Sequence, residues 1–123
     1  MAEYVLGQGQ MKVMRVLWEK KRATAQEIID ELNKAGVVRR STVQTFLRTL
    51  EKKGIVGHDV DKRTFIFYPL VTKEKITEHA FHNFMNHNFE GSMEGLVSYI
   101  VNSEKISAKE LEKIKKLLDD GEK

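Results

Sequence analysis

The chain has 123 residues, 41% of them hydrophobic and 32% charged, which is typical of one soluble globular domain or of a small domain with an appendage. The absence of cysteine excludes disulfides, thiolate metal sites and cysteine nucleophiles, and no apolar run approaches the roughly 20 residues of a membrane-spanning helix. The formal net charge of +3 is uneven, because residues 1–70 hold 13 Lys and Arg against 8 Asp and Glu, whereas residues 71–123 hold 8 against 10. The N-terminus lacks the pattern of a signal peptide, so we expect a cytoplasmic protein with a basic first half.

The first predicted helix extends from about Gln10 to Lys21, with its apolar residues on one face. A second helix follows in TAQEIIDELNKAG, where Thr24 and Glu27 have the spacing of a capping box, in which each side chain bonds the other residue's backbone N–H. Gly36 is expected to end this helix in a left-handed conformation. The residues expected to be buried in the two helices are Met11, Met14, Leu17, Trp18, Ala25, Ile28, Ile29 and Leu32.

The third predicted helix lies in STVQTFLRTLEKKG, residues 41–54. Ser41 and Gln44 have capping-box spacing, and Gly54 is expected to end the helix. One face is apolar, formed by Val43, Phe46, Leu47 and Leu50. The other face carries mostly short polar side chains instead of the long charged ones of an ordinary solvated helix, and its members are Thr42, Gln44, Thr45, Arg48, Thr49 and Lys52.

After Gly54 the pattern changes to that of strands. The runs IVGHDV and TFIFYPL are rich in β-branched and aromatic residues and are separated by DKR, so they predict a hairpin whose tip presents Asp61, Lys62 and Arg63. Pro69 would be tolerated because the second strand would lie at a sheet edge. Three short helices and a two-stranded hairpin predict a winged helix-turn-helix domain over residues 1–71, within a mainly α-helical chain.

The polar face of the third helix predicts DNA contacts. In a helix-turn-helix the second helix of the pair lies in the major groove and its N-terminal residues reach base edges. Gln bonds adenine bidentately and Thr contacts thymine, so we expect Thr42, Gln44 and Thr45 to contact bases, and Arg48 a base or a phosphate. The alternative is that Thr42, Thr45 and Thr49 are surface or capping residues without a partner.

The cations around this face are expected to contact phosphates, which position a protein without reading sequence. They are Arg39, Arg40, Lys52, Lys53, Lys62 and Arg63. The alternative is a basic surface that only keeps the protein soluble.

Residues 72–123 are predicted to be helical and to form a dimerisation domain. Thr72 caps a helix through about Asn88, SMEGLVSYIVN forms another, and Ser107 with Glu110 begins a third. So short a segment has too little core volume to bury the apolar faces of its helices, and a second copy of the chain would cover them. The residues expected at this interface are Phe81, Phe84, Phe89, Leu96, Ile100, Leu111, Ile114 and Leu118.

His79, His82 and His87 lie on one predicted helix and raise a metal site as an alternative. Only Glu78 is an acidic neighbour, so no metal or cofactor is expected, and we interpret the histidines as polar residues at the edge of the dimer interface. The sequence contains no phosphate-binding glycine-rich loop and no catalytic carboxylate pair. No enzymatic activity is therefore expected.

Four stretches, QMKVMRVLWEK, TAQEIIDELN, STVQTFLRTLEKKGIVGH and RTFIFYPLVTKE, resemble successive signatures of the BlaI/MecI family, the penicillinase and methicillin-resistance repressors of bacteria. The resemblance extends from about Gly7 to Leu118 and is strongest in the T-V-Q-T-x-L-x-x-L-x-K-K-G run. GLVSYIV and ISAKELEKIKKLL are similar to the family's dimerisation arm. The resemblance implies a homodimeric winged-helix repressor that binds a dyad-symmetric operator in double-stranded DNA, often beside a gene for antibiotic resistance.

The resemblance also implies how repression ends. Family members are typically inactivated when a membrane sensor-protease signals cleavage in the C-terminal arm, and by position the corresponding bond falls near Ser98, at Tyr99-Ile100. Members often have Asn-Phe at this bond, so the sequence departs from the family pattern there. A copper-responsive branch uses a C-terminal cysteine cluster, which this chain lacks.

Two other functions are alternatives to the repressor. A winged-helix module could dock an acidic protein partner, but protein interfaces concentrate their binding energy in aromatic and Arg residues, unlike this Thr- and Gln-rich face. A DNA-binding activator would have the same sequence features as a repressor.

Overall fold

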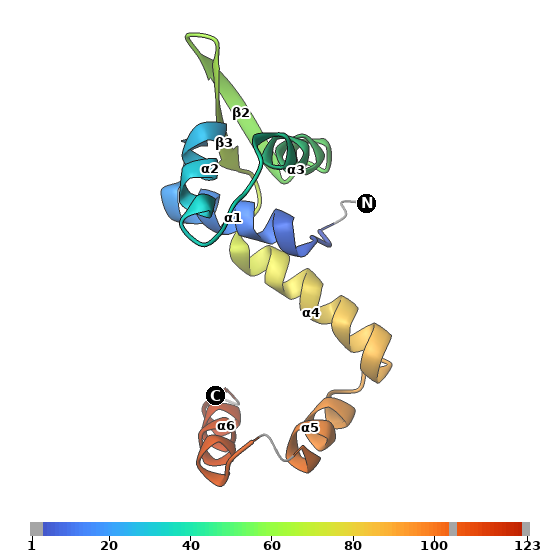
Figure 1. Cartoon of the computed structure of the whole chain (residues 1–123). Coiled ribbons are helices and arrows are strands. Elements are labelled where there is room, and N and C mark those ends of the chain that lie inside the picture. The colour runs from blue at the N-terminus through green and yellow to red at the C-terminus, as the bar shows by residue number, and fades with distance from the viewer. Residues whose placement is uncertain (1–3, 104–105, 122–123) are drawn as a thin grey trace. The chain divides into compact units, whose positions relative to one another are not determined.

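The computed structural model describes residues 4–103 and 106–121. The chain divides into two compact units, residues 1–80 and residues 81–123. The elements in chain order are α1 (Gln8–Lys20), β1 (Ala23–Thr24), α2 (Ala25–Asn33), α3 (Arg40–Lys52), β2 (Val56–Asp61), β3 (Thr64–Pro69), α4 (Lys73–Phe89), α5 (Met93–Asn102) and α6 (Ala108–Gly121) (Figure 1). The predicted mainly α-helical fold with a small sheet is confirmed.

The first helix, α1, packs against the rest of the first unit on both sides. Trp18 is half-buried, and its indole N–H donates to the backbone oxygen of Val71 over 2.9 Å, just before α4. Near the other end of α1, a Cβ on Gly9 would overlap the ring of Phe46 on α3. Glycine at this position therefore lets α1 and α3 approach closely.

The capping box predicted for the second helix is confirmed. The Glu27 N–H donates to Thr24 Oγ1 over 3.1 Å, and the Thr24 N–H donates to Glu27 Oε1 over 2.9 Å. The predicted stop at Gly36 is wrong, because α2 ends at Asn33 and Gly36 does not adopt a positive φ. The side chain of Asn33 instead accepts the Val38 N–H over 2.8 Å, which orders the connection to α3.

The third helix begins at Arg40, before the predicted N-cap residue Ser41. Arg39 occupies the N-cap position in an extended conformation, so Ser41 lies inside the helix and the Ser41–Gln44 capping box is wrong. At the other end Gly54 has a φ of 79°, as expected for the residue that ends α3. The chain then enters β2.

The sheet has three antiparallel strands in the order β1-β3-β2, so the second strand of the hairpin is central and its predicted edge position is wrong. The sequence pattern missed β1 because it has only two residues, Ala23 and Thr24, which pair with Phe67 and Ile66. Pro69 is tolerated because it lies at the last position of β3, beyond the residues that pair with β1.

One hydrophobic core joins the three helices to the base of the sheet. Beyond this core the β2–β3 hairpin extends past α2 and α3 as a wing (Figure 1). The buried residues are Val13, Met14, Val16, Leu17, Ala23, Ile28, Ile29, Val43, Leu47, Leu50, Ile55, Val56, Phe67 and Ile76.

Thr72 caps α4 as predicted, since its hydroxyl accepts the Lys75 N–H over 3.1 Å. In the second unit the ring of Phe89 lies 5.6 Å from that of Phe84 and 6.0 Å from that of Tyr99, centroid to centroid, which joins the end of α4 to α5. Ser107 accepts the Glu110 N–H over 3.1 Å at the start of α6. Among the described residues, no helix is both long and apolar enough to cross a membrane.

Candidate nucleic-acid interface

The third helix buries one face and exposes the other. Val43, Leu47 and Leu50 are at most 1% exposed and anchor α3 in the core. The residues predicted to contact bases lie on the exposed side, and they are Thr42, Gln44, Thr45 and Arg48. The Thr45 hydroxyl donates to the backbone oxygen of Ser41 over 2.9 Å, which leaves its oxygen able to accept a hydrogen bond.

The cations predicted to contact phosphates differ in their surroundings. Arg39 and Lys52 are exposed at the two ends of α3. Lys53 is half-buried, and its Nζ donates to the backbone oxygen of Val5 over 3.2 Å, so it is turned toward the N-terminal segment.

The wing presents two exposed cations at its turn. Lys62 and Arg63 have φ angles of 50° and 71°, and they connect Asp61 to its cross-strand partner Thr64. Two central residues with positive φ make the tight turn that matches the twist of a hairpin. Both side chains are exposed at the end of the wing, and Arg63 also lines the groove described next.

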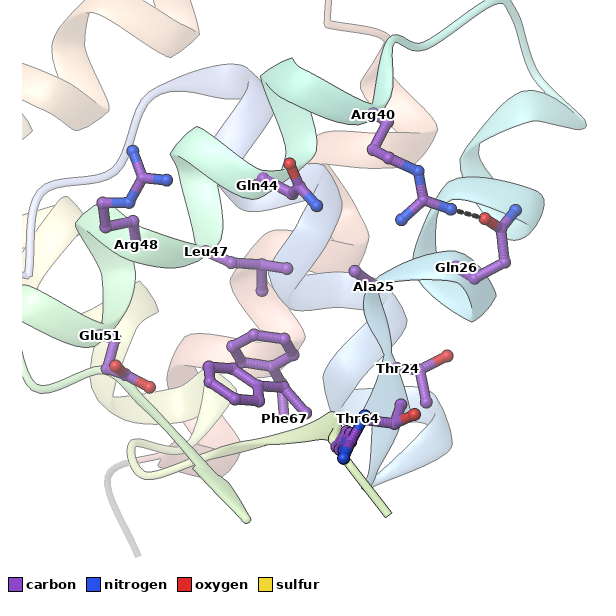
Figure 2. Close-up of a pocket in the computed structure, with 12 residues that line it drawn as sticks. Thr24, Ala25, Gln26, Arg40, Gln44, Leu47, Arg48, Glu51, Thr64 and Phe67 are labelled. Atoms are coloured by element: carbon purple, nitrogen blue, oxygen red, sulfur yellow. Dashed lines mark hydrogen bonds between the residues drawn. The ribbon is translucent and has the colours of Figure 1, made fainter. Parts of the chain in front are cut away.

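A groove of about 600 Å³ lies between the start of α2, the exposed face of α3 and β3 (Figure 2). Gln44 and Arg48 line it from α3, so residues predicted to read bases and residues of the wing border the same surface. The full set of lining residues is Thr24, Ala25, Gln26, Arg40, Gln44, Leu47, Arg48, Glu51, Arg63, Thr64, Phe65 and Phe67.

Two polar contacts beside this groove were not predicted from the sequence. The guanidinium of Arg40 donates to Gln26 Oε1 (Figure 2). Gln26 Nε2 in turn donates to Asp30 Oδ1 over 2.8 Å. The i,i+4 spacing of Gln26 and Asp30 was the signal for the second bond. The bond between α2 and α3 has no signal in the sequence, because it depends on how the two helices pack.

A further contact that was not predicted holds the wing to the strand before α2. Arg22 forms an ion pair with Asp59 of β2, and its guanidinium lies 5.0 Å from the centre of the Tyr68 ring. These contacts join the residue before β1 to both strands of the hairpin. No sequence pattern indicates the two-residue strand that brings Arg22 there.

Just after α2, the Lys34 ammonium donates to Glu31 Oε2 over 3.0 Å. This bond and the Lys34 charge hold the pKa of Glu31 below the ordinary glutamate value. Lys20 adds a smaller effect from 4.0 Å.

Within residues 4–103 and 106–121, no group of three or more His, Cys, Asp or Glu side chains is arranged to hold a metal ion. His79 instead packs edge-on against Tyr4, and His87 Nδ1 lies 2.8 Å from the backbone oxygen of Asn83.

A sequence model of the penicillinase repressor family matches residues 6–120, almost the whole chain. The chain belongs to the penicillinase repressor family. This is a family of transcriptional repressors and not of enzymes, which confirms the predicted winged-helix repressor.

Two relatives show how far the similarity extends. The methicillin resistance regulatory protein MecI of Staphylococcus aureus (strain N315) is 30% identical over 116 residues, which cover 94% of each protein. The penicillinase repressor of Bacillus licheniformis is 26% identical over 115 residues, 94% of this chain and 90% of that protein.

Two solved structures are similar to this chain in fold. The DNA-binding domain of the repressor BlaI superposes with a TM-score of 0.55 and 29% identity, over 61% of this chain and 93% of that domain. A cysteine-to-serine mutant of MarR from E. coli, solved in complex with operator DNA, has a TM-score of 0.53 over 94% of this chain and 74% of that one. At 19% identity, that second likeness concerns the fold alone.

Proposed function

We propose that this member of the penicillinase repressor family binds a dyad-symmetric operator as a homodimer, with α3 in the major groove and the wing on the adjacent backbone. The observation that carries the proposal is the exposed face of α3. Its members, Thr42, Gln44, Thr45 and Arg48, lie opposite the face that is buried through Val43, Leu47 and Leu50. Short polar side chains let the helix backbone come close to base edges. The relatives are a penicillinase repressor and a methicillin resistance regulator, which favours genes for penicillin or methicillin resistance as targets.

Phosphate contacts would come from exposed cations on both sides of this face. Arg39 and Lys52 lie at the ends of α3, and Lys62 and Arg63 lie at the tip of the wing. These side chains fix the position of the protein on the duplex without reading sequence. Lys53 contributes less, because its ammonium is already bonded to Val5.

Dimerisation is supported by apolar side chains that the second unit leaves uncovered. Among the described residues of 81–121 only Met85 is buried, whereas Phe84 is 47% exposed and Leu118 is 58% exposed. A second copy of the chain would remove such apolar surface from water. It would also place two copies of α3 on half-sites one helical turn, or a multiple of it, apart.

Repression on this proposal needs only occupancy of the operator, which excludes RNA polymerase without any chemical step. Release would follow cleavage in the C-terminal arm, signalled by a membrane sensor-protease, at Tyr99-Ile100. This bond lies inside α5, and Tyr99 is 67% exposed. Because proteases bind extended backbone, cleavage would require α5 to unwind locally.

The proposal is tested by selecting duplexes from a randomised pool with the full-length protein and measuring the affinity of the selected duplex at several salt concentrations. The selected sequences should share a palindrome, and log K should fall linearly with log[salt] because phosphate contacts release counterions. A scrambled duplex of the same composition is the control. Equal affinity for the selected and scrambled duplexes would reject sequence-specific binding.

A further inference from the structure

We infer that Arg40 reads a guanine in the operator and that Gln26 is the positioning residue that holds Arg40 in place. The sequence pattern predicted a phosphate contact for Arg40, and its surroundings in the structure point to a different role. This inference rests on the proposed function, because it assigns one base contact within the same DNA-binding face.

The position of Arg40 on α3 places it in line with a predicted base-reading residue. Arg40, Gln44 and Arg48 follow one another at intervals of four, and side chains four apart lie on one face of a helix. All three line the groove beside α3 (Figure 2). Arg40 is also the first residue of the helix, and the N-terminal residues of a recognition helix reach base edges.

A chain of hydrogen bonds fixes the side chain of Arg40. Its Nη2 donates to Gln26 Oε1, and Gln26 Nε2 donates to Asp30 Oδ1 over 2.8 Å. An ionised carboxylate only accepts, so Asp30 binds the NH₂ group of Gln26 and turns the amide oxygen toward Arg40. The guanidinium has five donors, and one bond to Gln26 leaves enough of them for the bidentate contact that Arg makes with guanine O6 and N7.

The neighbouring Arg39 has the surroundings that we expect of a residue that contacts phosphate. Its side chain is exposed and has no hydrogen bond or ion pair within the part of the chain that the structure describes. A phosphate contact needs mainly charge, whereas a base contact needs a guanidinium in a fixed direction. The bond to Gln26 gives the guanidinium of Arg40 such a direction.

Arg40→Ala and Arg39→Ala form a matched pair, because each removes one exposed positive charge at the start of α3. Their affinities are measured for the duplex selected by the wild-type protein and for duplexes in which each base pair is changed singly. Arg40→Ala should abolish the preference for guanine at one position of each half-site, a loss of roughly 5- to 150-fold in discrimination, and leave the salt dependence unchanged. Arg39→Ala should weaken all duplexes alike and reduce the slope of log K against log[salt] by about 0.9.

Arg40→Lys keeps the charge and removes the planar donor pair, so it should lose the guanine preference as well. Gln26→Leu removes the acceptor at similar size and should lower the same preference in part. The double variant Gln26→Glu with Asp30→Asn should show the guanine preference that Gln26→Leu lowers. Its introduced carboxylate accepts from Arg40, and its introduced amide donates to that carboxylate. The double variant also keeps the net charge of the protein. If Gln26 had only a structural role, Gln26→Leu would lower the melting temperature without changing the guanine preference selectively.

Uniform weakening by Arg40→Ala, with a reduced salt slope, would overturn the inference and return Arg40 to the phosphates, while the proposed function stands. A Gln26→Leu variant with the wild-type preference would overturn the positioning role of Gln26. A wild-type protein that prefers no duplex would instead mean that the proposed function has failed.

Discussion

The imidazole of His58 stacks on the ring of Phe65, with 4.1 Å between the ring centroids and 9° between their planes. His58 Nδ1 also contacts a carboxylate oxygen of Glu51 near the end of α3. One side chain of β2 therefore contacts both the neighbouring strand of the wing and the helix proposed to read DNA. The angle between wing and helix depends on such contacts, because the outer part of the hairpin lies beyond the core.

His58→Ala should loosen the wing. Loss of the aromatic contact costs about 1 kcal/mol in the free energy of unfolding, measured by urea denaturation. Affinity for the operator should fall as well, because the wing no longer keeps one position. His58→Phe is the control, since it retains the stack and removes only the contact with Glu51. Wild-type affinity in His58→Ala would show that the stack does not position the wing.

The turn of the wing should show opposite effects on stability and on binding. Lys62 and Arg63 both have positive φ. This conformation is unfavourable for Lys and Arg, whereas Asn and Gly adopt it readily. The double variant Lys62→Asn with Arg63→Gly should raise the free energy of unfolding by about 1 kcal/mol. The same variant should weaken all duplexes alike and reduce the salt slope by up to about 2, because two phosphate contacts are lost. A decrease in both stability and affinity would contradict this account of the turn.

Gln44→Ala tests the predicted base contact on the middle of α3. The change should cost roughly 1–3 kcal/mol on the operator and relax the preference at one base position, because a bidentate contact with adenine is lost. Thr49→Ala is a control on the same helix outside the predicted base contacts. If the ranking of operator variants stays the same in Gln44→Ala, the base-reading assignment of Gln44 is wrong.

Lys34→Ala should raise the pKa of Glu31 toward the ordinary glutamate value, as measured by NMR titration of the side-chain carboxyl carbon. The hydrogen bond from Lys34 is the largest cause of the lowered pKa, so Lys20→Ala should raise it less. A carboxyl group whose pKa is lowered on folding stabilises the protein above the pKa of the unfolded chain, and this contribution disappears as the pH falls through the folded pKa. The wild type should therefore be slightly more stable than Lys34→Ala near pH 7, and this difference should vanish at acidic pH. An unchanged Glu31 pKa in Lys34→Ala would contradict the assignment.

Phe84→Asp should shift the protein from dimer to monomer in sedimentation experiments. The change places a charge on an apolar side chain that is 47% exposed in the single chain and proposed to be covered by a second copy. Asn86→Asp adds the same charge at an exposed polar position of α4 and should leave the dimer intact. A dimer of undiminished stability in Phe84→Asp would exclude Phe84 from the interface.

The sequence by itself determined the elements whose signals are local. The capping box of Thr24 and Glu27, the end of α3 at Gly54 and the two long strands were predicted and are present, because backbone geometry and short-range side-chain bonds decide them. The apolar period of α3 also separated its buried face from its exposed one, so the candidate DNA-contacting residues follow from the sequence alone.

Only the tertiary structure decided the features that join segments far apart in the chain. β1 has two residues and no pattern of its own, and it exists because Ala23 pairs with Phe67 across the sheet, which makes β3 the central strand. The bond from Arg40 to Gln26 likewise joins side chains fourteen positions apart. Neither contact could be predicted from sequence, because periodicity reports which face of an element is buried but not which distant residue it meets.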